Sequence, residues 1–152
     1  MTNTIISISG DPVHASIEDL DSYGGFLVTT LEMQRFEEIS IRFCSREEIR
    51  DLNLQYRDLD KPTDILSFHL PGPSPEHDLG DLYLCVEEFE DQFKLGDARK
   101  LLFFLVSHGF LHLLGWTHET PEKFQEMMQR QENLVKGFLK SQEPSRAEDY
   151  GN

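Results

Sequence analysis

The longest apolar run of the chain extends from Leu101 to Leu114, and polar side chains interrupt it only at Ser107, His108 and His112. The run is shorter than the roughly 20 residues that a membrane-spanning helix needs. Gly115 follows it directly and is suited to ending a helix. We therefore predict a buried helix over residues 98–114, around which the rest of the chain must fold with two histidines inside.

The spacing of the histidines indicates a metal site. His108 and His112 are four residues apart, so both imidazoles project from one face of the helix, and the turn at Gly115 lets His118 approach them. Three histidine ligands leave a fourth position open, as in catalytic zinc sites. The alternative is two hydrogen-bonded core histidines and one surface histidine, but an unpaired buried imidazole costs about 1–3 kcal/mol. The pattern H-x3-H-x2-G-x2-H favours the metal.

Gly109 separates this pattern from the zincin proteases. Zincins carry a glutamate directly after the first histidine, where it serves as general base. Here that position holds glycine, so ordinary peptidase chemistry lacks its base. Glycine also lowers helix stability by about 1 kcal/mol relative to alanine, which indicates that something packs close to the backbone at this point.

The remaining periodicity predicts one α+β domain. Ser45 and Glu48 form a capping box for a helix from Arg46 to Tyr56 or Arg57, and Thr120 with Pro121 begins another helix. Residues 12–38 are expected to be helical with a break at Gly24-Gly25. Four stretches alternate apolar and polar residues and are predicted strands: 4–9, 39–44, 64–70 and 81–86. We expect a mixed sheet of about four strands, packed with helices that include a zincin-like metal helix, over residues 1–140, and a polar, flexible tail over 141–152.

The helix beginning at Arg46 carries two stripes of interest. At 100° per residue, one sector that would face the core holds Ile49, Leu52 and Tyr56. Three arginines fall on a neighbouring stripe about 40° wide, namely Arg46, Arg50 and Arg57. The stripe is either a solvated face or an edge that holds phosphates.

Charge and composition limit the location and the partners. The chain has 28 acidic and 14 basic residues, a formal net charge of -14, which repels nucleic acids and anionic membranes at long range. The N-terminus has no basic segment followed by an apolar one, so we expect no signal peptide and a cytoplasmic location. In that reducing compartment Cys44 and Cys85 are expected to stay unpaired.

The sequence HGFLHLLGWTH, together with LNLQYRDLDKPTDILSF and LGDLYLCV, resembles the bacterial YbeY-type rRNA maturation factor family, from about Ile39 to Lys140. The resemblance implies a zinc-dependent endoribonuclease, specific for single strands, that acts in small-subunit rRNA 3′-end maturation and ribosome quality control. It implies that His108, His112 and His118 bind one zinc ion and that Arg57 is the arginine required for activity. The expected partners are single-stranded rRNA and the small ribosomal subunit or its assembly factors, with no role for DNA or a membrane.

One departure from the family pattern concerns the metal site. Thr117 stands where family members usually carry an aspartate before the third histidine, which removes a group that could orient a ligand, unless Glu119 replaces it. Two other functions remain open. One is a ribosome-assembly binding protein with a structural zinc, and the other, disfavoured by Gly109, is a metalloprotease or another metal hydrolase.

Overall fold

The structure is a computed structural model that describes residues 4–92 and 96–143. Its sheet has four strands, β1 (Ile5–Ser9), β2 (Phe36–Phe43), β3 (Ile65–Leu70) and β4 (Asp78–Leu84), in the order β1-β2-β4-β3. The pairs β1–β2 and β2–β4 are parallel, whereas β3 is antiparallel to β4. The predicted mixed four-stranded sheet and the α+β class are confirmed.

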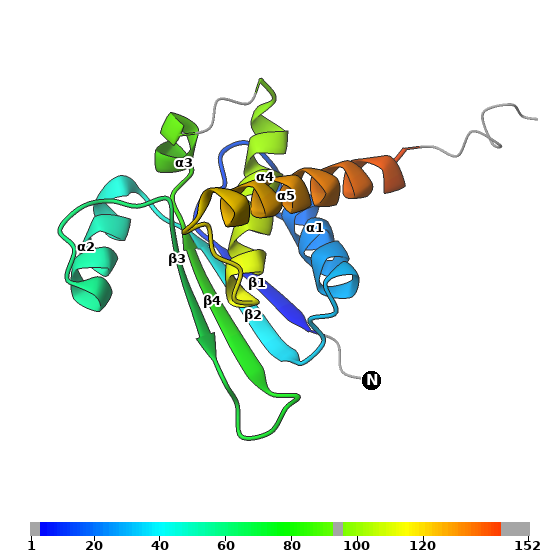
Figure 1. Cartoon of the computed structure of the whole chain (residues 1–152), viewed down its shortest axis with the longest axis horizontal. Helices are drawn as coiled ribbons and strands as arrows, with labels where there is room; N and C mark the ends of the chain where they lie inside the picture. The colour runs from blue at the N-terminus through cyan, green and yellow to red at the C-terminus, as the bar shows by residue number, and fades with distance from the viewer. Residues whose placement is uncertain (1–3, 93–95, 144–152) are drawn as a thin grey trace, which may run out of the picture.

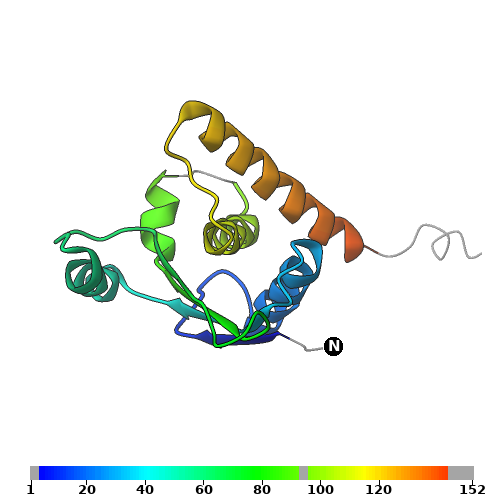
Figure 2. The ribbon, with the colours of Figure 1, turned by 60° about the horizontal axis from the view of Figure 1, so that its bottom comes forward.

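Helices α1 (Ile17–Thr30) and α4 (Ala98–Leu113) cover one face of the sheet, and α5 (Pro121–Ser141) packs against α4 on the side away from the strands (Figures 1 and 2). Alternation places Ile39, Ile41, Leu82 and Leu84 beneath these helices in the main core. Helix α2 (Arg46–Arg57) lies beside the end of the sheet and closes a second small cluster around Ile49, Leu66, Cys44 and Cys85.

Local sequence rules account for most helix ends. Both halves of the predicted capping box at Ser45 and Glu48 are present at the start of α2, and Thr120 caps α5 with Pro121 in its first turn. Gly115 has φ 91°, a conformation that favours glycine, directly after the C-cap of α4. These predictions are confirmed.

Three predictions were wrong in detail. Residues 12–38 were expected to be helical, but α1 covers only Ile17–Thr30, and residues 36–38 already belong to β2. Helix α1 continues through Gly24 and Gly25 without the expected break. A Cβ at Gly24 would lie 3.3 Å from Ile6, so the glycine lets the helix lie close to β1. This packing stabilises a helix that the two glycines alone would weaken. The sequence prediction also missed the short helix α3 (Val86–Gln92), whose first residue, Val86, was assigned to the preceding strand. The expected tail is helical as far as Ser141, and its residues 144–152 lie outside the described part of the chain.

Cys44 and Cys85 are both buried and free. Among the residues that the structure describes, no helix combines the length and the apolar character needed to cross a membrane.

Candidate functional site

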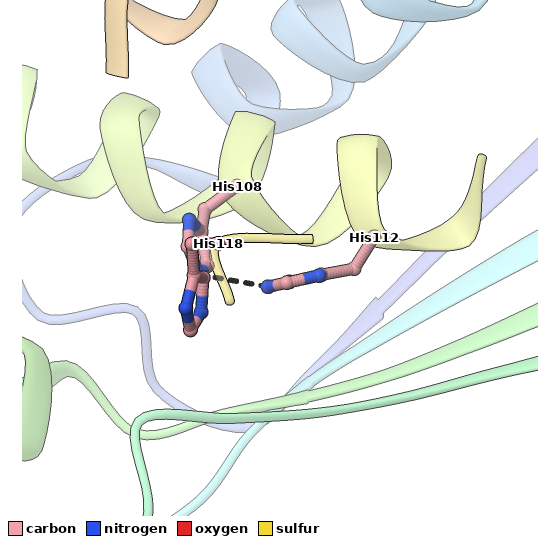
Figure 3. Close-up of side chains that lie close together, drawn as sticks. All are labelled: His108, His112 and His118. Atoms are coloured by element: carbon pink, nitrogen blue, oxygen red, sulfur yellow. Dashed lines mark hydrogen bonds between the residues drawn. The ribbon is translucent and has the colours of Figure 1, made fainter. Parts of the chain in front are cut away.

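The three predicted histidines meet at the end of α4 that leads to Gly115. Each offers a ring nitrogen, and the three atoms lie within 4.8 Å of one another. His108 and His118 stack with ring centroids 5.5 Å apart, while the ring of His112 points its edge at His108, as Figure 3 shows. His108 is buried, His112 is half-buried and His118 is exposed, so the cluster reaches from the core to the surface.

Hydrogen bonds determine which nitrogens are available. The Nδ1 atom of His112 lies 2.9 Å from the Trp116 carbonyl oxygen, which can only accept, so this nitrogen donates. The Nδ1 atom of His108 lies 3.0 Å from Oε1 of Gln131, and Nε2 of Gln131 donates to the Phe104 carbonyl at 3.2 Å. That second bond sets the orientation of the Gln131 amide, so His108 also donates through Nδ1. Both Nε2 atoms are therefore unprotonated in the neutral rings.

These two Nε2 atoms lie 3.0 Å apart. Two facing lone pairs at that distance repel each other unless a proton or a metal cation lies between them. Burial opposes the proton, because it lowers the pKa of His108 to about 3 and lowers the pKa of His112. Two nitrogens on one tetrahedral zinc ion would lie about 3.3 Å apart. The donor set therefore fits a divalent cation better than it fits a pair of structural histidines.

Gly109 lies where α4 comes closest to the sheet. A Cβ there would be 2.9 Å from Cδ1 of Leu82 and 3.1 Å from Cδ1 of Ile65. Both neighbours are buried, so any side chain at this position would begin in contact with the packed core. The close packing expected at Gly109 is confirmed, and a glutamate at the position of the zincin base would require Leu82 and Ile65 to move.

A pocket of about 540 Å³ opens beside the cluster. It brings together segments that are far apart in the sequence: Arg57, residues 63–68, His112 and residues 117–119. Asp64 is in this lining, and burial raises the pKa of its carboxyl above its usual value. Thr117 and Glu119 also face the pocket, so the position at which the family pattern has an aspartate does lie at the site.

The arginine stripe is divided by ion pairs. Arg46 contacts Glu88 at 3.1 Å and also contacts Asp91. Arg50 donates to Asp60 at 2.8 Å. Of the two alternatives for the stripe, the structure disfavours a single phosphate-binding edge, since the guanidinium groups of Arg46 and Arg50 bind acidic partners. Of the three, Arg57 is the one that lines the pocket.

The end of α2 positions Arg57. The next residue, Asp58, has φ 58° and ends the helix in the left-handed conformation. The buried side chain of Asn53 then donates to the Lys61 carbonyl at 2.8 Å, which ties the following loop to the helix. This loop leads directly into Thr63 and Asp64 in the pocket wall. The turn thus places Arg57 at the pocket, whose lining also includes residues of β3.

Gln131 is a functional residue that the sequence prediction missed. It is fully buried on α5 and bonds His108 from 23 residues away. A detectable indication existed, because Gln131 is a polar residue four positions after Met127 and four before Val135, on the apolar face of the helix. A polar side chain at a core position needs a partner, and here the partner is an imidazole of the cluster.

Comparisons with known proteins identify relatives of this chain. The sequence model of the family described as Endoribonuclease YbeY matches residues 17–139. Endoribonuclease YbeY of Acetivibrio thermocellus is 33% identical over 148 residues, covering 84% of this chain and 91% of that protein. Endoribonuclease YbeY of Staphylococcus aureus strain JH9 is 38% identical over 112 residues, covering 66% and 72%.

A solved structure has a similar fold. The solution structure of TM1509 from Thermotoga maritima superposes with a TM-score of 0.54 at 28% identity, covering 90% of this chain and 93% of that one. The family match includes β2, β3, β4, the histidine cluster and Arg57, so the chain belongs to the endoribonuclease YbeY family.

Proposed function

We propose that this protein is a zinc-dependent endoribonuclease that cleaves single-stranded RNA in the maturation of the small-subunit rRNA 3′ end and in ribosome quality control. We place it in the cytoplasm, with the small ribosomal subunit or its assembly factors as partners. The observation that carries the proposal is the pocket in which Arg57 lies across from His112 and His118. The named activity of the relatives supports the reaction class.

The proposed ligands are His108, His112 and His118. A divalent cation held by them would supply Lewis acidity toward a phosphate oxygen or a water molecule. Gln131 and the Trp116 carbonyl hold the first two rings with Nε2 directed to the common centre. Because His118 is exposed and lines the pocket, the open side of the cluster is accessible to substrate.

Arg57 is the proposed catalytic residue. Its guanidinium is the cationic side chain in the pocket lining, and it can donate two parallel hydrogen bonds to a phosphate. A phosphodiester that undergoes attack gains negative charge, which this fixed positive group would stabilise. Asp58 directly follows Arg57 in the chain, and its carboxylate repels phosphates, so Arg57 would also set where the backbone of the RNA lies.

The test is cleavage of an end-labelled single-stranded RNA that carries the precursor 3′ end of small-subunit rRNA. Arg57→Ala should cut about 10²- to 10³-fold more slowly, the usual loss when one transition-state donor is removed. His112→Ala should lose both the bound metal and the cleavage. Two matched controls should cut like the wild type: Arg50→Ala, whose guanidinium binds Asp60, and His77→Ala, on an exposed loop.

Circular dichroism of each variant would verify folding, and metal content would be measured in parallel. Equal cleavage by wild type, Arg57→Ala and His112→Ala would identify a contaminating nuclease and contradict the proposal. An assembly-binding role with a structural metal would then be the better description, and metal removal would unfold the protein without a selective effect on RNA.

A further inference from the structure

The last turn of α2 leaves an aromatic ring outside the core. Periodicity puts Tyr56 in the same sector as Ile49, but the structure buries Ile49 completely and leaves Tyr56 55% exposed. The ring of Tyr56 lies against Phe68 of β3, with centroids 5.3 Å apart and a tilt of 59°. Because the rings are tilted rather than stacked, this contact leaves much of the Tyr56 ring open to solvent.

This exposed ring is continuous with the proposed active site. Phe68 lines the same pocket as Arg57 and His112, and Tyr56 directly precedes Arg57 in the chain. On its other side Phe68 meets Tyr83 of β4 edge-on at 6.1 Å, and both pack on the small cluster beneath α2. The packing holds Phe68 in place, so Tyr56 rests on a fixed support beside the pocket.

We propose that Tyr56, supported by Phe68, is a stacking platform for an unpaired nucleobase of the RNA whose phosphate contacts Arg57. The proposal rests on the proposed function and adds a residue that positions the substrate. Aromatic rings accept any base in this way because every base has a π-face, and only single strands expose that face. The platform would thus favour single strands with little preference for sequence.

The surrounding charge favours a base over a phosphate at this point. Asp81 is the strand partner of Phe68, and Asp58 follows Arg57. A phosphate would be repelled by these carboxylates, whereas a neutral base would not. A protein partner is disfavoured by size, since a single aromatic side chain buries about 150–250 Å² and a stable interface needs about 800 Å² from each partner.

The experiment uses the metal-loaded full chain and single-stranded RNAs in which 2-aminopurine replaces one base at successive positions. Stopped-flow fluorescence records quenching on mixing, before cleavage, and gives the Kd, while cleavage gives kcat. Tyr56→Ala should raise the Kd about 5- to 150-fold, the range seen when the aromatic partner of a base is removed. It should also abolish quenching at one position, with kcat at saturating RNA little changed.

Tyr56→Phe should restore both affinity and quenching, because the ring is kept. The control is Leu54→Ala, which removes an apolar side chain that is 45% exposed from the same helix. Unchanged quenching and Kd in Tyr56→Ala, or an equal loss in Leu54→Ala, would overturn the platform even if the wild type cleaves RNA. Quenching that depends on Tyr56 in a protein that cleaves no RNA would support the platform and refute the proposed nuclease function.

Discussion

At the scale of single residues, hydrogen bonds explain how an apolar helix can hold two imidazoles. Each Nδ1 has a carbonyl acceptor, from the Gln131 side chain or the Trp116 backbone. The Nε2 atoms are left facing each other, and burial lowers the pKa of both rings, which opposes a proton between them. The two hydrogen bonds therefore satisfy one nitrogen of each ring and leave the other nitrogen free for the proposed cation.

Replacing Gln131 tests this arrangement. Gln131→Met keeps the volume of the side chain but removes the acceptor for His108, so the ring loses its orientation. Metal affinity is expected to fall about 10- to 100-fold, measured by competition with a chromophoric chelator. Gln129→Met is the control, because Gln129 is exposed and bonds Asn133 on the same helix. Equal metal affinity in the two variants would mean that Gln131 has no part in ordering the site.

At the scale of elements, α4 combines the core of the protein with its site. Glycines mark where it meets the sheet: Gly109 faces Leu82 and Ile65, and a Cβ at Gly80 of β4 would lie 2.8 Å from Leu113. Close packing at these two points sets the distance between α4 and the sheet. It therefore also sets how far His112 lies from the pocket wall that β3 supplies.

A pair of glycine substitutions separates packing from helix propensity. Gly25→Ala in α1 adds a Cβ that meets nothing within 4 Å, so it should raise the free energy of unfolding by up to about 1 kcal/mol. Gly109→Ala gains the same propensity but overpacks the core, at a cost of about 1–3 kcal/mol. Urea unfolding should therefore find Gly109→Ala less stable than Gly25→Ala by roughly that cost. Equal stability of the two variants would contradict close packing at Gly109.

At the scale of the whole molecule, the charge is opposite to that of most proteins that bind RNA. The net charge of -14 repels phosphates, and two of the three arginines on α2 are held by Glu88, Asp91 and Asp60. Binding must depend on local contacts at the pocket and not on a basic surface. In the proposed function, RNA that is already unpaired or is presented by a partner meets this requirement best.

This balance predicts a weak dependence on salt. With one phosphate at Arg57, the Kd for single-stranded RNA should rise about threefold or less between 50 and 200 mM KCl. A protein with six phosphate contacts would lose roughly 300-fold over the same range. Fluorescence anisotropy at both salt concentrations makes the comparison, and Arg57→Ala should remove most of the remaining dependence. A loss above thirtyfold would show that several further basic residues contact the RNA.

Much of the secondary structure could be predicted from the sequence, because it depends on interactions between residues that are close together in the chain. The capping box begins α2, Gly115 ends α4, Pro121 begins α5, and the four-residue spacing places His108 beside His112. Alternating strands predicted the sheet for the same reason, since side chains two residues apart share a face. These features depend on local geometry, which the order of the residues already contains.

The tertiary structure decided what depends on distant partners. Gly24 lies inside α1 because Ile6 packs against it, and Gln131 joins the site because α5 crosses α4. Three arginines on one helix face looked equivalent, yet acidic side chains elsewhere in the fold bind two of them and leave Arg57 at the pocket. Which charges pair and which rings stay exposed is set by elements that meet only in three dimensions. Periodicity along one helix cannot encode that choice.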